Sequence, residues 1–202
     1  MSEPVDEDEH RAKKARIKEA KDRLNAGKTR EKGLLIVHTG TGKGKSTAAW
    51  GLAMRCLGHG LKIGVVQFVK GRRETGERKL LERFPELVSL KVMGEGFTWE
   101  TQDRARDIAA ARAAFDEAKR MLHDPELHLV VLDELNIVLR YDYLPLEEVL
   151  EALRGKRPDL HVVVTGRNAP EALIEAADLV TEMKLVKHPF REGIKGQRGV
   201  EY

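Results

Sequence analysis

Cysteine, aromatic residues and long apolar runs are all scarce in this chain of 202 residues. The one cysteine, Cys56, cannot form an internal disulfide. It falls in step with the apolar positions of an expected helix, so we predict a small core residue rather than a nucleophile. No apolar run approaches the roughly 20 residues of a membrane span, and no secretory signal pattern is found. We therefore expect a cytoplasmic protein without a membrane span.

The seven histidines are scattered, and none stands three or four residues from another. This spacing excludes a zinc site held by paired histidines on one helix face. The chain also has no nucleophile elbow and no other Ser/His/Asp signature. It thus lacks an obvious general acid, general base or nucleophile.

Charge is nearly balanced over the chain but not along it, with 36 basic and 33 acidic residues and a net charge of +3. Residues 1–9 hold five acidic side chains, whereas residues 11–32 hold ten basic and three acidic ones. Such blocks are typical of a solvated tail. We predict a mobile tail over 1–32, with a helix around 12–24 able to act as a lid, and a domain over 33–202. Nucleic-acid binding is disfavoured, because the basic block has no aromatic residue for base stacking.

The most informative segment is a glycine-rich turn, Thr39–Thr47 (TGTGKGKST), between an apolar run and a helix-forming segment. Small residues let backbone N–H groups surround a phosphate, and the following helix points its positive N-terminus at it. We expect Lys45 to place a charge on the phosphates and the Ser46 hydroxyl to bind Mg²⁺. The segment departs from the strict phosphate-loop pattern only at Thr39, where glycine is usual. The alternative is a glycine-rich turn with two incidental lysines.

Short apolar runs alternate with helical patterns after the tail. Strands are expected at 34–38, 62–68, 87–92, 128–132, 160–165 and 179–186, and helices at 45–58, 76–83, 103–123, 146–154 and 170–176. The strand runs are continuously apolar, as in strands covered on both faces. We therefore predict an α/β fold: a P-loop NTPase-like three-layer sandwich with a mainly parallel central sheet.

Two carboxylates, Asp133 and Glu134, end the apolar run before them. Such an acidic strand end completes a phosphate-loop site by holding Mg²⁺, directly or through water. The alternative is that Asp133 caps the helix that starts near Leu135. A second carboxylate beside the metal can also position water, which leaves ATP hydrolysis open.

Two further segments carry side chains suited to a ligand. Arg167 follows another buried strand, where its planar fork can meet phosphate, ribose or carboxylate, or else form a surface salt bridge. Phe97 and Trp99 stand in a glycine-flanked loop of a chain that is only 5% aromatic. They either fold back onto the core or form a platform for a large planar ligand.

Seven motifs in order resemble the ATP:corrinoid adenosyltransferase family, over about Gly33 to Tyr202. They are residues 39–46 (TGTGKGKS), 64–71 (GVVQFVKG), 96–101 (GFTWET), 131–135 (VLDEL), 141–148 (YDYLPLEE), 165–167 (TGR) and 186–190 (VKHPF). The resemblance implies transfer of the 5′-deoxyadenosyl group of ATP to cob(I)alamin or another cob(I)corrinoid, as in cob(I)yrinic acid a,c-diamide adenosyltransferases, with release of tripolyphosphate. Reduced cobalt is then the nucleophile, so no general base is needed.

The resemblance also implies roles for individual residues. Those expected to wrap the triphosphate are Gly40, Thr41, Gly42, Lys43, Gly44, Lys45, Ser46 and Thr47. Ser46 and Glu134 would hold Mg²⁺, or Mn²⁺ in its place, with Asp133 nearby. Phe97 and Trp99 would exclude the lower axial ligand of cobalt, and Arg55 and Arg167 would reach substrate.

The resemblance further implies a homodimer and an electron-donor flavoprotein that reduces cobalt. One departure is Arg73, where the family often has an aromatic residue; a stacking role there is in doubt. Two alternatives remain on the same fold. One is an ATPase or small-molecule kinase that releases ADP, which leaves the aromatic loop unexplained. The other is a non-catalytic nucleotide- or nucleic-acid-binding module that uses the basic tail.

Overall fold

The computed structural model describes residues 7–69, 75–92 and 103–201. Its strands are β1 Leu35–Thr39, β2 Ile63–Gln67, β3 Val88–Val92, β4 Leu129–Asp133, β5 His161–Thr165 and β6 Leu179–Glu182. Its helices are α1 Glu7–Ala26, α2 Lys45–Gly58, α3 Gly76–Leu81, α5 Arg104–His123, α6 Leu135–Arg140, α7 Leu146–Arg154, α8 Glu171–Ala176 and the 3₁₀ turn η1 Pro189–Glu192.

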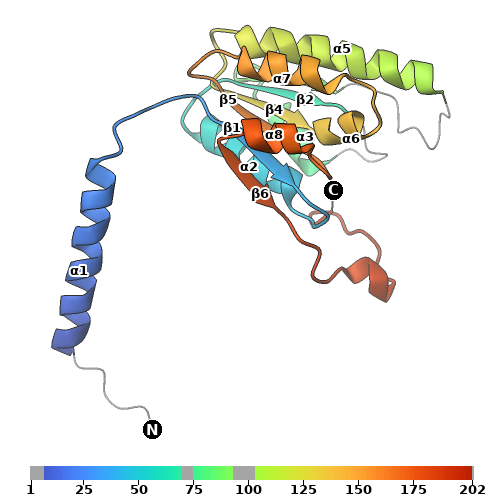
Figure 1. Ribbon diagram of the computed structural model, residues 1–202. Coiled ribbons are helices and arrows are strands. Elements are labelled where there is room, and N and C mark those ends of the chain that lie inside the picture. The colour runs from blue at the N-terminus through green and yellow to red at the C-terminus, as the bar shows by residue number, and fades with distance from the viewer. Residues whose placement is uncertain (1–6, 70–74, 93–102, 202) are drawn as a thin grey trace. The chain divides into compact units, whose positions relative to one another are not determined.

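The six strands form one sheet in the order β3-β2-β4-β5-β1-β6, and every neighbouring pair is parallel. Helices cover both faces, with α5 and α7 on one side and α2 on the other (Figure 1). The predicted three-layer α/β fold with a parallel sheet is confirmed. Because all strands run the same way, their carboxyl ends meet at one edge, where such sheets bind ligands.

Strand side chains explain why both faces are covered. In β4, Val130 and Leu132 belong to the core under α5 and α7, whereas Leu129 and Val131 belong to the core under α2. Successive residues of a strand point to opposite faces, so a continuous apolar run must be buried on both. Cys56 of α2 is half-buried against the second core, and burial raises its thiol pKa.

The chain divides into two compact units, with the boundary between Glu31 and Lys32. In the first unit, α1 buries none of its residues. Its first turn carries Glu7, Asp8 and Glu9 and its last turn Arg23, which is the arrangement that the helix dipole favours. These three acidic residues therefore favour the start of the helix locally. None of the helices in the described ranges has the length and apolarity needed to cross a membrane.

Candidate active site

The predicted phosphate loop joins β1 to α2. Gly40 and Gly44 have φ of 97° and 104°, in the left-handed region that favours glycine. Gly44 is the N-cap of α2 and makes no side-chain capping bond. The first N–H groups of a helix have no partner within the helix, so those of this 14-residue helix are available to an anion.

Two of the loop glycines are also required by a neighbouring segment. The Gly42 N–H donates to the carbonyl of Met183 at 2.6 Å, just beyond β6. A Cβ at Gly42 would lie 2.7 Å from that oxygen, and one at Gly40 would lie 2.5 Å from it. Glycine is therefore needed here for packing against Met183, a reason that the sequence pattern did not reveal.

Lys45 is the buried cation of the loop, with 7% of its surface exposed. Its ammonium donates to the Gly42 carbonyl. Burial lowers the pKa of Lys45, the Glu134 carboxylate opposes this shift, and the positive charges of Arg167 and Lys43 add to it. These four predicted side chains therefore share one electrostatic environment at the carboxyl edge of the sheet.

Asp133 and Glu134 are adjacent in sequence but differ in their partners. Asp133 accepts hydrogen bonds at both carboxylate oxygens, from the Thr165 hydroxyl at 2.7 Å and from the Gln67 amide at 3.1 Å. The Glu134 N–H donates to the same Thr165 hydroxyl at 2.9 Å. Asp133 is thus held by the ends of β2 and β5, and it does not cap α6, because Glu134 occupies the N-cap position.

Glu134 combines backbone strain with an unsatisfied carboxylate. It adopts φ 61°, uncommon for a residue other than glycine, and Oε2 is buried with no hydrogen-bond partner in the described ranges. Burial, and then the Asp133 charge, raise the Glu134 pKa to about 7 against the opposing effect of Lys45. A buried carboxylate oxygen of this kind calls for a cation or a proton.

A Mg²⁺ site of one or two carboxylates plus substrate phosphates fits this arrangement. No group of three or more His, Cys, Asp or Glu side chains in the described part of the chain is placed to hold a metal by itself. Glu134 and the half-buried Ser46 on the first turn of α2 are the available ligands. Asp133 would act behind them, since its oxygens already accept two hydrogen bonds.

The other predicted loop residues, Thr41, Lys43 and Thr47, are exposed. Arg167 is exposed too, directly after Gly166, whose carbonyl accepts from the Asn136 amide at 3.2 Å. A Cβ at Gly166 would lie 2.8 Å from that of Asn136, so close packing fixes the turn that carries Arg167.

Arg55 is not brought to this site by the structure. It is exposed and stands ten residues beyond Lys45 on the same helix, which corresponds to about 15 Å along the axis. A contact with phosphates in the loop of the same protomer is out of its reach. Its predicted role in binding substrate therefore stays a prediction.

Phe97, Trp99 and Arg73 lie outside the described residues. The chain is described again from Asp103, the N-cap of α5. Next to it, Arg104 donates to the Tyr141 carbonyl at 3.2 Å and lies 5.3 Å from the centre of the Tyr143 ring. The start of α5 is therefore anchored to the 141–148 motif.

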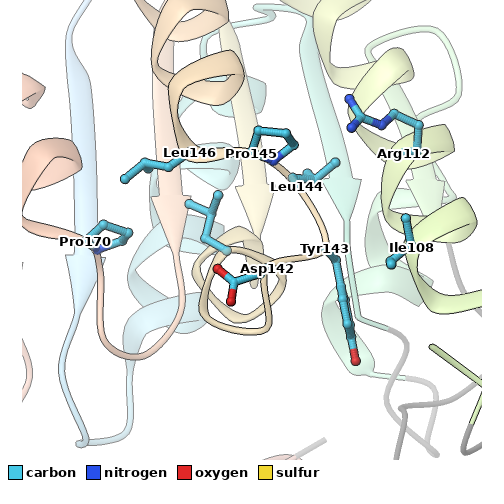
Figure 2. A pocket seen from close by; sticks show the side chains of 9 residues that line it. Ile108, Arg112, Asp142, Tyr143, Leu144, Pro145, Leu146 and Pro170 are labelled. Atoms are coloured by element: carbon cyan, nitrogen blue, oxygen red, sulfur yellow. The ribbon is translucent and has the colours of Figure 1, made fainter. Parts of the chain in front are cut away.

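That segment lines a pocket of about 470 Å³ (Figure 2). Ile108 and Arg112 of α5 form one wall, and Pro170 at the start of α8 lies on the opposite side. Asp142 and Tyr143 also line the pocket, and the Tyr143 ring points downward in this view. The pocket is mainly apolar with a few polar groups, the usual character of a small-molecule site.

Comparison with known proteins agrees with this geometry. A family model described as ATP:corrinoid adenosyltransferase BtuR/CobO/CobP matches residues 31–202. A protein of Pseudomonas aeruginosa named corrinoid adenosyltransferase is 55% identical over 203 residues, covering 100% of both chains. A Sinorhizobium protein of the same name is 54% identical over 98% of this chain and 95% of its own. The Salmonella typhimurium corrinoid adenosyltransferase CobA is 46% identical over 98% of this chain and 100% of its own. The chain belongs to the ATP:corrinoid adenosyltransferase family.

Proposed function

We propose that this protein transfers the 5′-deoxyadenosyl group of ATP to cob(I)alamin or another cob(I)corrinoid. Cobalt(I) supplies the electron pair for the new cobalt–carbon bond, the C5′–O bond breaks, and its pair leaves with tripolyphosphate. The observation that carries the proposal is the buried Lys45 ammonium in a glycine loop, within electrostatic reach of the half-buried Glu134, whose Oε2 is buried. Both groups suit a polyphosphate leaving group and its cation.

The role of the protein in this reaction is alignment and charge neutralisation. The α2 N-terminus and Lys45 bind the phosphates that carry the growing negative charge. Lys45 is already desolvated, so its charge acts on the leaving group with little screening by water. No side chain has to move a proton, which agrees with the absence of an obvious general base.

Mg²⁺, or Mn²⁺ in its place, is proposed as the metal. The support is the buried Oε2 of Glu134, which has no hydrogen-bond partner among the residues that the structure describes, and the position of Ser46 on the first turn of α2. When bound, the cation would neutralise phosphate charge. Thr165 and Gln67 hold Asp133 beside this site, where its negative charge adds to that of Glu134.

The corrinoid is proposed to lie at the same edge, against the aromatic loop and the pocket of Figure 2. The support is that Arg104, two residues into the described chain after that loop, contacts Tyr141 and Tyr143, and Tyr143 lines the pocket. A homodimer and a flavoprotein electron donor are proposed from the family resemblance, and a cytoplasmic location is proposed from the sequence pattern. Sedimentation of the purified protein tests the dimer.

The deciding experiment is product analysis under strict anaerobiosis with ATP, Mg²⁺ and cob(I)alamin, while the corrinoid spectrum is followed. Tripolyphosphate appearing together with a light-sensitive cobalt–carbon product is the expected result. ADP and phosphate with an unchanged corrinoid would instead support an ATPase or kinase on this fold.

Phe97→Ala and Trp99→Ala are each expected to affect turnover from cob(II)alamin but not transfer to cob(I)alamin. Because these rings are proposed to exclude the lower axial ligand, each variant should retain transfer to chemically pre-reduced cob(I)alamin. Turnover that starts from cob(II)alamin should fall by at least about tenfold, since five-coordinate cobalt is harder to reduce. Parallel rate measurements with the two substrates test this, and an equal loss in both would contradict the role.

A further inference from the structure

The segment after β6 returns to the phosphate loop. Met183 makes two backbone hydrogen bonds to the loop. Its N–H donates to the Thr39 carbonyl at 2.9 Å, and its carbonyl accepts from the Gly42 N–H. The chain then runs through η1, turns at Gly193 with φ 77°, and comes back to an ion pair between Glu201 and Lys43. Figure 1 shows this segment in red, leaving β6 and returning toward the loop that follows β1.

A pocket of about 420 Å³ lies between this segment and the loop. Four cationic side chains line it: Lys43, Arg167, Arg191 and Lys195. One carboxylate, that of Glu201, lines it as well. His188 also lines it. The volume falls in the range of small-ligand sites, which start at about 300 Å³. A pocket with this excess of positive charge suits a compact polyanion.

The pocket shares Lys43 and Arg167 with the proposed ATP site. Lys43 is two residues before Lys45. Arg167 lines the pocket, and its positive charge lowers the pKa values of Lys45 and Glu134. A series of cationic side chains therefore extends from the buried Lys45, through Lys43 and Arg167, to Arg191 and Lys195 of the C-terminal segment. A phosphate chain is the ligand whose charges repeat along such a path.

Glu201 occupies the place that an incoming phosphate would take. Its carboxylate hydrogen-bonds the Lys43 ammonium, and this contact lowers the pKa of Glu201. The Lys43 side chain is 59% exposed, so an anion can reach it and displace the carboxylate. An exposed ion pair contributes little to stability, so a multiply charged ligand can displace the carboxylate.

We propose that the segment Lys184–Glu201 forms the far wall of the polyphosphate site. It binds the terminal phosphate of ATP and the tripolyphosphate product through Arg191 and Lys195. Glu201 is an internal competitor for Lys43 that leaves when the anion arrives. This inference rests on the proposed function, because it assigns the end of the same ligand.

The test is titration calorimetry of the full chain with sodium tripolyphosphate and Mg²⁺, without corrinoid. The Arg191→Ala/Lys195→Ala double variant should weaken binding about tenfold, since two charge-assisted contacts at partly exposed positions are lost. The matched control is Lys184→Ala/Lys187→Ala, because these lysines of the same segment pair with Glu182 and Glu192. They do not line the pocket, so a change within twofold is expected. AMP binding should be unchanged in both.

Glu201→Gln is expected to act in the opposite direction. Removal of the competing carboxylate should tighten tripolyphosphate binding severalfold, because Lys43 no longer has to exchange partners. A purely structural ion pair predicts the reverse, namely weaker binding from a loosened segment. Weaker binding in Glu201→Gln, no loss in the Arg191/Lys195 variant, or equal loss in its control would each overturn the proposal.

These outcomes are separable from failure of the proposed function. If the anaerobic product is ADP while the binding changes follow as expected, the pocket stands as a polyphosphate site and adenosyl transfer is wrong. If transfer occurs but tripolyphosphate affinity is unchanged in the Arg191→Ala/Lys195→Ala variant, the function stands and this assignment is wrong.

Discussion

Lys45→Ala is expected to lower kcat/KM for adenosyl transfer by at least about 10³-fold. The Lys45 ammonium is buried and desolvated within the loop, so its attraction for the leaving tripolyphosphate is large and water cannot replace it. Anaerobic kinetics with ATP and cob(I)alamin measure the effect. Full activity in this variant would refute the assignment of the phosphate loop.

The stability of the Lys45 variant distinguishes a catalytic loss from misfolding. Burial lowers the pKa of Lys45, which means that folding disfavours its charge near neutral pH. Its removal should therefore leave the melting temperature unchanged or raise it. Lys62→Ala is the matched control, because Lys62 forms an exposed pair with Glu126 at 3.0 Å, and activity should stay within twofold.

The strands were predictable because their physical requirement is simple. A run such as Leu129–Asp133 is apolar at successive positions, and only a strand covered on both faces buries such a run. The predicted strand at 179–186 was wrong in its last four residues. There the Met183 carbonyl turns to Gly42 rather than extending the ladder with β1. That contact joins residues 141 positions apart, which local sequence patterns do not report.

Side-chain partners were harder to predict than the elements themselves. Even the six-residue helices α3, α6 and α8 were expected, α6 from a start near Leu135. The resemblance implied that Glu134 holds the metal with Asp133 nearby, but the sequence pattern gave no physical reason for this difference. The hydrogen bonds to Asp133 come from Thr165 and Gln67, which lie on neighbouring strands of the sheet rather than at neighbouring positions in sequence. Both stand in motifs that had been recognised, but nothing in the motifs assigned them this role.

Glu134→Gln is expected to lower the Mg²⁺-dependent transfer rate by about 10²- to 10³-fold without loss of stability. The amide has nearly the shape of the protonated carboxyl, and burial already raises the Glu134 pKa to about 7. The folded chain therefore loses little when the charge is removed, whereas a metal loses a ligand. Mg²⁺ titrations of activity and thermal unfolding measure the two effects. Glu126→Gln, from the exposed pair with Lys62, is the control.

Asp133→Asn should lower stability more, and Mg²⁺-dependent activity less, than Glu134→Gln. Asparagine offers one acceptor where Asp133 offers two, so either the Thr165 hydroxyl or the Gln67 amide loses its bond. The expected cost is about 1–3 kcal/mol of unfolding free energy, with a weaker effect on Mg²⁺ affinity than in Glu134→Gln. If Asp133→Asn abolished Mg²⁺ dependence while Glu134→Gln retained it, the direct ligand would be Asp133. Thr165 and Gln67 would then have to release it when the metal binds, and the buried Glu134 carboxyl would serve as a proton-holding neighbour instead.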